Sequence, residues 1–571
     1  MFGRRLTSGA WACLAVLQVG RAWAQPKLAQ DTWGAPQPPI SPSDAGNPGV
    51  PPEGAPEPAE PRSDPPAAVR VSASGPTTPT GETRTRRRRR ELTDGCADCY
   101  ARSHLKGAQE LNVRYTLEGI EVRGNSRTSP RVILRYVRFK AGDVLDVDDP
   151  EVELTRFRLL GTGFFRDVQF SLRKGSDRGL VVLRIDVTER NTIVVNDISM
   201  GLSADADTRG HAKRLSAYAG LDVAETNLGG TGITLGAAAA IAEQQRAIRV
   251  RFLDPAFLGS PFMTSGYLLF NDTRDYFGNA SFKWADPLNN APTSPAVVRY
   301  KRFGGALGVG RDLSVSTQLW LTYRLETINA SVPLEASHLR GYAREPIDFH
   351  VIPGRSVLST IGGTLQLDTR DQPVLPTRGW FLSFHGELSL LPLSLDYDYQ
   401  RFELDVSRWW RLPGHDHVFK LSLFAGGIAG DAPFFEQFYV GDFTDFLPDR
   451  VLGVNFDRRP PPNFLGTEIV EVRYGDFAAK IGGEYRIPVY RGRRSIYGID
   501  FFASAGLYAV AGRRDLTHPP LGYSGLARIP VDVTGNLGLR LDTSAGGFTF
   551  AFSNVLSFIP VRGEGPAGGR E

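Results

Sequence analysis

The chain has 571 residues, with 66 Lys and Arg against 62 Asp and Glu, and it contains 3 Cys. This length is too great for a small disulfide-stapled module, and a net charge of +4 does not suggest a nucleic-acid-binding protein. Beyond the first 25 residues no apolar run approaches the ~18 residues that a membrane-spanning helix needs. This argues against a helical membrane protein.

The first 24 residues have the pattern of a secretory signal peptide. Arg4 and Arg5 form a basic start, an apolar stretch follows over residues 10–19, and Ala22-Trp23-Ala24 fits a cleavage site. We expect cleavage after Ala24. A buried N-terminal helix is the alternative, and it is disfavoured because a proline-rich stretch follows at once.

Residues 25–110 are predicted to be a disordered linker, because 15 of the 40 prolines of the chain fall between positions 25 and 90. The linker ends in Arg84 and the run Arg86–Arg90, which could attract acidic lipid head groups or could form part of a solvated tether. Cys96 and Cys99 follow without a second cysteine pair. A local disulfide or two free thiols therefore fits better than a zinc site.

Residues 111–195 are predicted to form a small α+β domain in the order β-α-α-β-β. Residues 115–122, which include Leu117, Ile120 and Val122, are predicted to form a strand that a Gly-Asn turn closes. Ser129-Pro130 and Asp149-Pro150 are start signals for two helices, and Gly161 is a stop signal. Two further strands are expected over residues 168–174 and 180–189, where apolar and polar residues alternate.

From residue 196 to residue 560 the pattern is all-β. Segments of eight to twelve residues, such as 380–389, alternate between apolar and polar residues. About 365 residues divided among 16 strands leaves about 23 per strand with its loops, which suits a transmembrane barrel of 16 antiparallel strands. A soluble β-sandwich is the alternative. A polar tail, 561–571, is expected to follow the barrel.

The α+β segment resembles a polypeptide-transport-associated (POTRA) domain. The matching stretches are LEGIEVRGNSRTSPRVILRYVRFKAGDVLD, LLGTGFFRDVQFSL and GLVVLRIDVTERNTIVVNDI. The resemblance rests on the order and spacing of these stretches and on the residues Gly124, Asn125, Gly163, Phe164 and Phe165. It implies a single domain of this kind on the periplasmic side.

The barrel segment resembles the bacterial surface-antigen, BamA-TamA-like family of outer-membrane assembly proteins. The match lies in ETNLGGTGITLG (225–236), LDTRDQPVLPTRGW (367–380), GGEYRIPV (482–489) and GLRLDTSAGGFTFAF (538–552). The resemblance implies a long loop inside the barrel. Arg450 and Gly453 are the counterparts of its loop motif, although Val451 and Leu452 separate them here.

The resemblance also implies contacts for these residues. We expect Arg450 to reach an inner-wall carboxylate by a charge-assisted contact, with Glu484 and Asp368 as candidates. A solvated loop arginine is the alternative for Arg450. The aromatic signal of the closing strand consists of Phe548, Phe550, Phe552 and Phe558, although the polar tail follows it.

No enzyme is predicted, because the sequence has no GxxxxGK[ST], HExxH or GxSxG motif, and no cofactor or metal site is expected. Asp368, Asp371 and Glu484 could be read as paired carboxylates for acid–base chemistry. Carboxylates on the inner wall of a barrel more often pair with arginines, and Arg370, Arg486 and Arg540 are available.

The resemblance implies ATP-independent insertion or translocation of polypeptides in the bacterial outer membrane. Client strands would add to a POTRA edge at 168–174 and 180–189 and to the barrel seam. The glycines at 229, 230, 232 and 236 would thin the first barrel strands and weaken pairing at that seam. The expected partners are unfolded outer-membrane or secreted polypeptides, outer-membrane lipid and accessory periplasmic subunits, with no nucleic acid. A dedicated two-partner secretion pore and a passive channel are the alternatives.

Overall fold

The computed structural model describes residues 114–146, 150–206, 212–277, 282–285, 292–294, 296–333, 336–340, 343–389, 396–414, 416–444, 450–455, 464–470, 472–492, 495–518 and 522–553. The signal peptide, the linker, Cys96, Cys99 and the Arg86–Arg90 run lie outside this part of the chain, and so do Phe558 and the polar tail.

The first described unit is an α+β domain. Its elements are β1 (Arg114–Arg123), α5 (Pro130–Arg135), β2 (Val144–Asp146), α6 (Pro150–Gly161), β3 (Phe165–Lys174) and β4 (Leu180–Glu189). Both helices begin at the predicted prolines, because a proline in the first turn gives up no helical hydrogen bond. The short β2 is an addition to the predicted order of elements.

The sheet of this domain has the order β2-β1-β4-β3, with β1 and β4 parallel and β3 and β4 antiparallel. Both helices pack on it around a core that includes Leu117, Ile133, Leu159 and Val168. Because β4 lies between two neighbours, β3 alone of the two predicted edge strands has a free edge. This corrects the expectation for residues 180–189.

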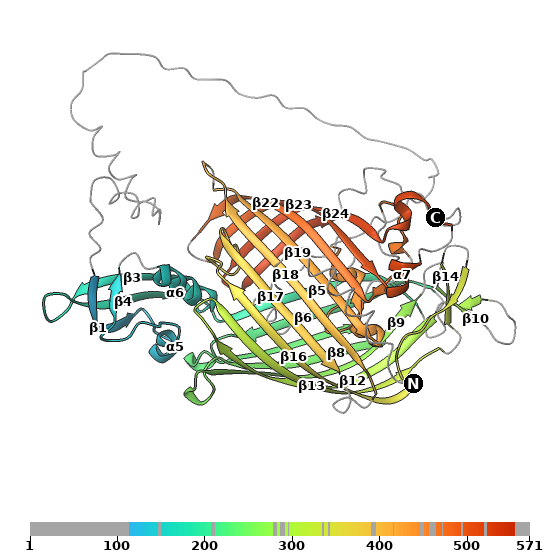
Figure 1. Cartoon of the computed structure of the whole chain (residues 1–571), viewed down its shortest axis with the longest axis horizontal. Helices are drawn as coiled ribbons and strands as arrows, with labels where there is room; N and C mark the ends of the chain where they lie inside the picture. The colour runs from blue at the N-terminus through green and yellow to red at the C-terminus, as the bar shows by residue number, and fades with distance from the viewer. Residues whose placement is uncertain are drawn as a thin grey trace, which may run out of the picture. The chain divides into compact units, whose positions relative to one another are not determined.

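The rest of the described chain forms one long antiparallel sheet that curls into a nearly closed barrel (Figure 1). Its strands are β5 (Ile193–Ala206), β6 (Ala212–Glu225), β7 (Thr234–Ala242), β8 (Gln245–Asp254), β9 (Phe262–Phe277), β12 (Ala296–Asp312), β13 (Thr317–Ser331), β16 (Gly354–Asp368), β17 (Gly379–Ser389), β18 (Tyr399–Arg411), β19 (Val418–Gly430), β22 (Phe477–Arg491), β23 (Ile496–Ala511), β24 (Val531–Thr543) and β25 (Gly546–Ser553).

The described residues thus supply 15 barrel strands, where the sequence indicated 16. The expected number came from a uniform share of residues per strand. The described part of residues 431–476, between β19 and β22, instead adds no strand to the barrel wall.

The two faces of each barrel strand differ as the alternation predicts. On β12, for example, Leu307 is 74% exposed on the outer face, whereas Tyr300 and Arg302 are buried on the inner face. Apolar side chains outside and polar or charged side chains inside are the arrangement of a barrel that stands in lipid. None of the described helices has the length and the apolar character needed to cross a bilayer.

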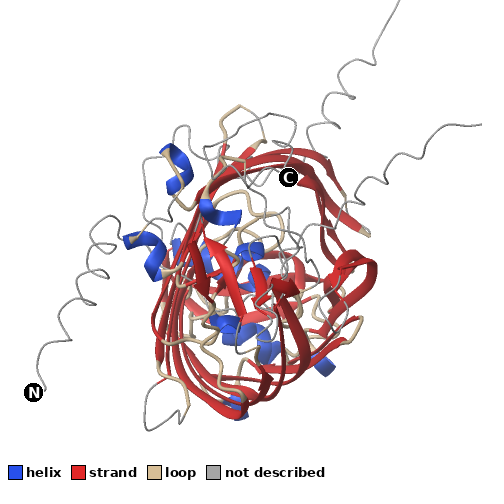
Figure 2. Cartoon of the chain, turned by 90° about the vertical axis from the view of Figure 1, so that its right-hand side faces the viewer, coloured by secondary structure: helices blue, strands red, loops and turns tan. Residues whose placement is uncertain are grey.

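The α+β domain lies at one end of the barrel, because β5 follows β4 directly. A second small sheet consists of β10 (Phe282–Ala285), β11 (Pro292–Ser294), β14 (Ala336–Arg340) and β15 (Ala343–Pro346), and it belongs to the loops at the other end. Helix α7 (Arg513–Thr517) follows β23 at that same end. Figure 2, which looks toward this end, shows the strands as a curved wall around loop segments.

Candidate functional site

The described residues between positions 431 and 476, here called the lumen loop, fold inside the barrel. It contains the 3-10 turns η3 (Phe434–Glu436), η4 (Val440–Asp442) and η5 (Glu468–Val470), and the short strands β20 (Phe438–Tyr439) and β21 (Tyr474–Gly475). Its aromatic side chains pack against inward-facing wall residues. Phe434 meets Tyr300 of β12 and Phe277 of β9, with ring centroids 5.5 and 5.7 Å apart. This burial of aromatic area keeps the loop in the lumen.

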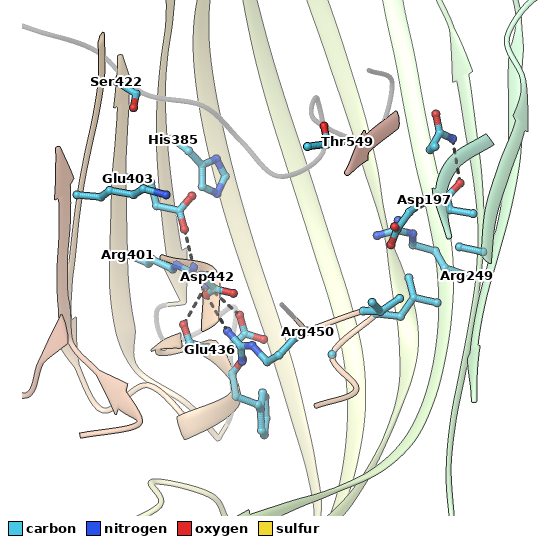
Figure 3. Close-up of a pocket in the computed structure, with 18 of the residues that line it drawn as sticks. Asp197, Arg249, His385, Arg401, Glu403, Ser422, Glu436, Asp442, Arg450 and Thr549 are labelled. Atoms are coloured by element: carbon cyan, nitrogen blue, oxygen red, sulfur yellow. Dashed lines mark hydrogen bonds and ion pairs between the residues drawn. The ribbon is translucent and has the colours of Figure 1, made fainter. Parts of the chain in front are cut away.

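The carboxylate of Glu436 makes a charged contact between this loop and the wall. It accepts hydrogen bonds from Arg302 of β12 at 2.9 Å and from Arg324 of β13 at 3.1 Å. Arg401 of β18 donates to the backbone carbonyl of Glu436 at 2.9 Å. Figure 3 shows Glu436 beside Arg401 at the cavity. Three arginines from three strands therefore converge on one loop residue.

Burial alone would raise the pKa of the Glu436 carboxyl. The charges of Arg324 and Arg302 outweigh burial and hold that pKa below its ordinary value. The wall balances the arginines further, because Arg302 also pairs with Glu326 at 2.7 Å and Arg324 with Glu387 at 2.6 Å. The cluster is a buried network of alternating charges, and removing one member leaves others unpaired.

Arg450 lies inside the lumen, but its described contacts differ from the predicted ones. It donates to the backbone carbonyls of Phe435 at 3.1 Å and Gln437 at 3.2 Å, and it pairs with Asp442 at 3.4 Å. Its guanidinium also lies over the ring of Tyr439, 5.1 Å from the centroid. Through these described contacts Arg450 ties parts of the lumen loop to one another.

The carboxylates that the sequence suggested as partners of Arg450 pair with wall residues instead. Glu484 of β22 accepts a hydrogen bond from Arg540 of β24 at 2.6 Å. Asp368 of β16 pairs with Arg370 at 2.6 Å in the turn that follows. Neither carboxylate has a described contact with Arg450, because Arg540 and Arg370 already pair with them.

Gly453 forms the tip of the lumen loop. Leu452 and Gly453 both have positive φ, at 53° and 78°, in a tight turn that Val451 and Val454 close by paired backbone hydrogen bonds. Asn271 of β9 donates to the carbonyl of Leu452 at 2.7 Å. A Cβ atom on Gly453 would come within 2.7 Å of the Asn271 amide nitrogen. A larger residue at this position would be strained at this positive φ and would displace the Asn271 side chain.

A cavity of about 670 Å³ remains in the lumen beside the loop. Charged side chains from both sides line it, including Asp197, Arg249, Glu403, Asp442 and Arg450 (Figure 3). Such a polar interior suits water and extended polypeptide better than lipid.

The first and last strands of the described barrel, β5 and β25, form its seam. Among the described residues they share no ladder, and the backbone N–H of Val195 donates to the carbonyl of Ala545 at 2.8 Å. Phe550 and Phe552 project outward from β25 with 53% and 72% exposure, and Phe548 is half-buried on the same face. Three residues of the predicted closing signal thus lie on this last described strand.

The α+β domain touches the barrel through several turns. Arg158 of α6 binds Asp312 at the end of β12 and donates to the carbonyls of Ser314, at 3.2 Å, and Val315. Arg378 of the β16–β17 turn pairs with Glu153 of α6. These contacts hold α6 against the rim of the barrel.

The β6–β7 turn makes a further contact with this domain. Asn227 donates to the hydroxyl of Thr128 at 2.9 Å, and Ser129 N–H donates to the carbonyl of Gly230 at 2.9 Å. Gly229, Gly230 and Gly232 all have positive φ in this turn. The expectation that these three glycines thin the first strands is therefore wrong, because only Gly236 of the four lies in a strand.

The POTRA-type residues cluster around one carboxylate. Glu189 at the end of β4 accepts hydrogen bonds from the Ser126 hydroxyl at 2.7 Å and from the Thr128 N–H at 2.6 Å. Burial alone would raise the pKa of the Glu189 carboxyl. These hydrogen bonds, together with one from the Arg127 N–H, outweigh burial and hold that pKa below its ordinary value. Gly124 begins this loop with φ of 83°. Glycine is needed there, because a Cβ atom would overlap the carbonyl of Val187.

The other predicted residues of this domain form part of its fold. Asn125 donates to the carbonyl of Thr128 at 3.0 Å and closes the turn before α5. Gly163, with φ of 72°, lies in the turn after α6, and Phe164 and Phe165, which follow it, are buried in the core. Their positions support the local fold, and the direct contacts with the barrel come from other residues.

Fold and site together define an outer-membrane β-barrel with a long loop in its lumen and a POTRA domain in the periplasm. Comparison with known families agrees: residues 227–458 match the Omp85 superfamily domain, and residues 115–190 match the POTRA family, described as surface antigen variable number repeat. The chain thus contains one region that matches an Omp85 superfamily domain and one that matches a POTRA domain, and these matches support a BamA-TamA-like family.

Two curated relatives share limited identity with the chain. A putative outer membrane protein assembly factor of Treponema pallidum is 22% identical over 298 residues, or 49% of this chain and 34% of that protein. Outer membrane protein assembly factor BamA of Neisseria meningitidis is 25% identical over 337 residues, or 56% of this chain and 38% of that protein. The matched region thus spans little more than a third of each relative.

The solved structure of CdiB from Escherichia coli is also similar. It has 11% sequence identity and a TM-score of 0.46, and the match covers 77% of this chain and 73% of that one.

The cluster of Glu436 with Arg302, Arg324 and Arg401 was not predicted from the sequence. Its signal is one acidic residue inside the apolar run PFFEQFYV. A glutamate in such a run is rarely buried without a partner, so the position could have been singled out, but its three arginines could not.

Proposed function

We propose that this protein inserts polypeptides into the outer membrane or passes them across it, without ATP. The observation that carries the proposal is the seam. Among the described residues β5 and β25 share no ladder, and β5 meets the last hairpin through the backbone hydrogen bond from Val195 to Ala545 in the β24–β25 turn. An unpaired strand edge in lipid leaves amide groups without partners, at a cost of several kcal/mol for each. A client strand that pairs with this edge satisfies those groups.

The free edge of β3 supplies a second place for an extended client, on the periplasmic side. Strand addition uses backbone hydrogen bonds, so it tolerates many client sequences. The proposed clients are unfolded outer-membrane or secreted polypeptides. A client that leaves β3 meets the barrel at the rim, where the POTRA domain is bound through Arg158 and Asp312.

The lumen loop would control the insertion or passage of clients through its contacts with the barrel wall. With Glu436 bound by Arg302 and Arg324, the loop fills part of the lumen and braces β12 and β13. Its tip reaches Asn271 of β9, on the side of the barrel nearer β5. A shift of the loop would therefore change support for the strands near the seam.

Photo-crosslinking in cells tests the seam. A crosslinking residue at Met200 of β5 or Phe550 of β25, both exposed, is expected to trap nascent outer-membrane or secreted polypeptides, which mass spectrometry then identifies. Leu321 of β13 is 60% exposed on the opposite wall and is the matched control. Equal trapping at all three positions would contradict a client site at the seam.

Depletion of the protein separates the related functions. Broad loss of outer-membrane proteins indicates assembly, whereas loss of one exported protein indicates a dedicated secretion pore. If neither loss occurs, the barrel is a passive channel and the proposal is wrong.

A further inference from the structure

On the outer face of the barrel, Arg408 of β18 lies between two tryptophans. Its guanidinium carbon is 4.6 Å from the ring centroid of Trp380 on β17 and 5.5 Å from that of Trp410. Trp380 is directly opposite Arg408 in the antiparallel register, and β17, β18 and β19 lie side by side (Figure 1). Both rings attract the cation through their faces and leave its N–H groups available.

The site lies near the periplasmic end of the barrel. Trp380 is the second residue of β17, which begins just after the turn that binds the POTRA domain through Arg378. Arg408 is three residues from the end of β18, or about 10 Å along the strand. This is the depth at which aromatic belts meet lipid head groups.

The neighbouring rows of outward side chains fit that depth. The row nearer the periplasm is aromatic and consists of Trp410, Phe419 and Tyr485. The row farther into the membrane is aliphatic and consists of Leu382, Val406, Leu423 and Ile481. The guanidinium therefore lies between an interfacial row and a hydrocarbon row.

Arg408 lacks a counterion among the described residues. No described carboxylate lies within ion-pair distance, and its Nε is buried without a hydrogen-bond partner in the described part of the chain. Arg411, which follows on the same strand, pairs with Asp416. An arginine is always charged, and a half-buried cation at a lipid surface is costly unless an anion neutralises it.

We propose that Arg408, Trp380 and Trp410 form a binding site for the phosphodiester of one glycerophospholipid from the periplasmic leaflet of the outer membrane. The guanidinium edge can hold two phosphate oxygens at once. The acyl chains would lie along the aliphatic row. That row also favours a lipid over free phosphate, because an inorganic ion gains nothing from apolar side chains.

Native mass spectrometry of the full-length protein, released from detergent with added lipid, tests this site. Phosphatidylglycerol and the diacylglycerol with the same acyl chains differ in the phosphate-containing head group. We expect the wild-type protein to retain one phosphatidylglycerol and not the diacylglycerol. Arg408→Gln should lower that retention about tenfold, the usual scale for one strong charged contact. Equal retention by wild type and R408Q would overturn the proposal.

Arg311→Gln is the matched control. Arg311 lies at the same end of the barrel on β12, outward and exposed, over the single ring of Phe262 at 5.6 Å. If R311Q and R408Q lower retention equally, general attraction to a basic surface explains the binding, and the specific site is refuted.

Arg408→Lys guards against a folding defect, since it keeps the charge at this position. Lysine cannot hold two oxygens in the same fork or lie flat between two rings. R408K should therefore show heat-dependent gel mobility like the wild type but retain severalfold less phosphatidylglycerol. Full retention by R408K would contradict the bidentate geometry.

Discussion

The carboxylate of Glu436 accepts a hydrogen bond from the guanidinium of Arg302 at 2.9 Å, although the two residues are 134 positions apart in the sequence. Arg302 in turn pairs with Glu326 on the wall. The wall thus supplies the arginines and the loop supplies a carboxylate that they need. Arg302 on β12 thus connects Glu436 of the loop to Glu326 on β13. The position of the lumen loop and the stability of the barrel wall are therefore linked.

We predict that Glu436→Gln will loosen the lumen loop and destabilise the barrel. The glutamine keeps the size of the side chain but leaves Arg302 and Arg324 short of one negative charge. Breaking a buried ion pair by removing one partner costs about 3–5 kcal/mol. The expected result is a lower temperature at which the folded, fast-migrating form disappears in a denaturing gel.

Asp348→Asn is the control for this loss of charge. Asp348 lies in a loop at the far end of the barrel with its side chain 76% exposed. It should leave the transition unchanged, since exposed pairs contribute little. A drop of equal size in both variants would show that net charge, and not the Glu436 contact, sets the transition.

We predict that Arg450→Lys will weaken the lumen loop nearly as much as Arg450→Ala. Arg450 donates to the carbonyls of Phe435 and Gln437 from two nitrogens and lies over Tyr439, which a lysine cannot do at the same time. Each lost charged hydrogen bond costs about 1–3 kcal/mol. Faster cleavage of the loop by added protease is the expected result.

Arg355→Lys provides the comparison, because Arg355 is exposed at the start of β16. It should leave the cleavage rate unchanged. If R450K behaves like the wild type, the charge of Arg450 matters and its geometry does not.

The sequence was enough to predict the α+β domain and the β-barrel. The alternation over 380–389 and the helix starts at Pro130 and Pro150 are local signals, and the structure has strand β17 and helices α5 and α6 there. The partners of Arg450 and Glu436 were not predictable in this way. They depend on how a long loop crosses the lumen, and no local pattern records which wall residues it meets.

We predict that Arg158→Ala will release the POTRA domain from the rim of the barrel. Arg158 supplies the bonds to Asp312, Ser314 and Val315, so alanine removes three contacts together. Hydrogen exchange over 312–316 should quicken, while exchange in the core of the POTRA domain stays the same.

A double-mutant cycle with Asp312→Asn isolates the pair. Because Arg158 and Asp312 contact each other directly, the double variant should lose less than the sum of the two single losses. Strict additivity would mean that the two side chains act on docking independently, contrary to the structure.

We predict that acid will loosen the loop before α5 through Glu189. The folded-state pKa of Glu189 is lowered, so its stabilising effect is complete above the unfolded pKa of about 4.3 and is lost as the pH falls through the folded pKa. Amide protection of Arg127 and Thr128, corrected for intrinsic exchange, should be steady from pH 7 to about 5 and should fall toward pH 3.

Glu189→Gln should remove this dependence, because the amide keeps one acceptor oxygen but never carries charge. Protection in this variant should be up to about tenfold lower at pH 7 and flat below pH 5. Glu121→Gln is the control within the same domain, since Glu121 pairs with Arg123, whereas Glu189 accepts the hydrogen bonds from Arg127 and Thr128. The control should follow the wild-type curve. A wild-type curve that rises toward low pH would mean that a group with a raised pKa governs the loop in place of Glu189.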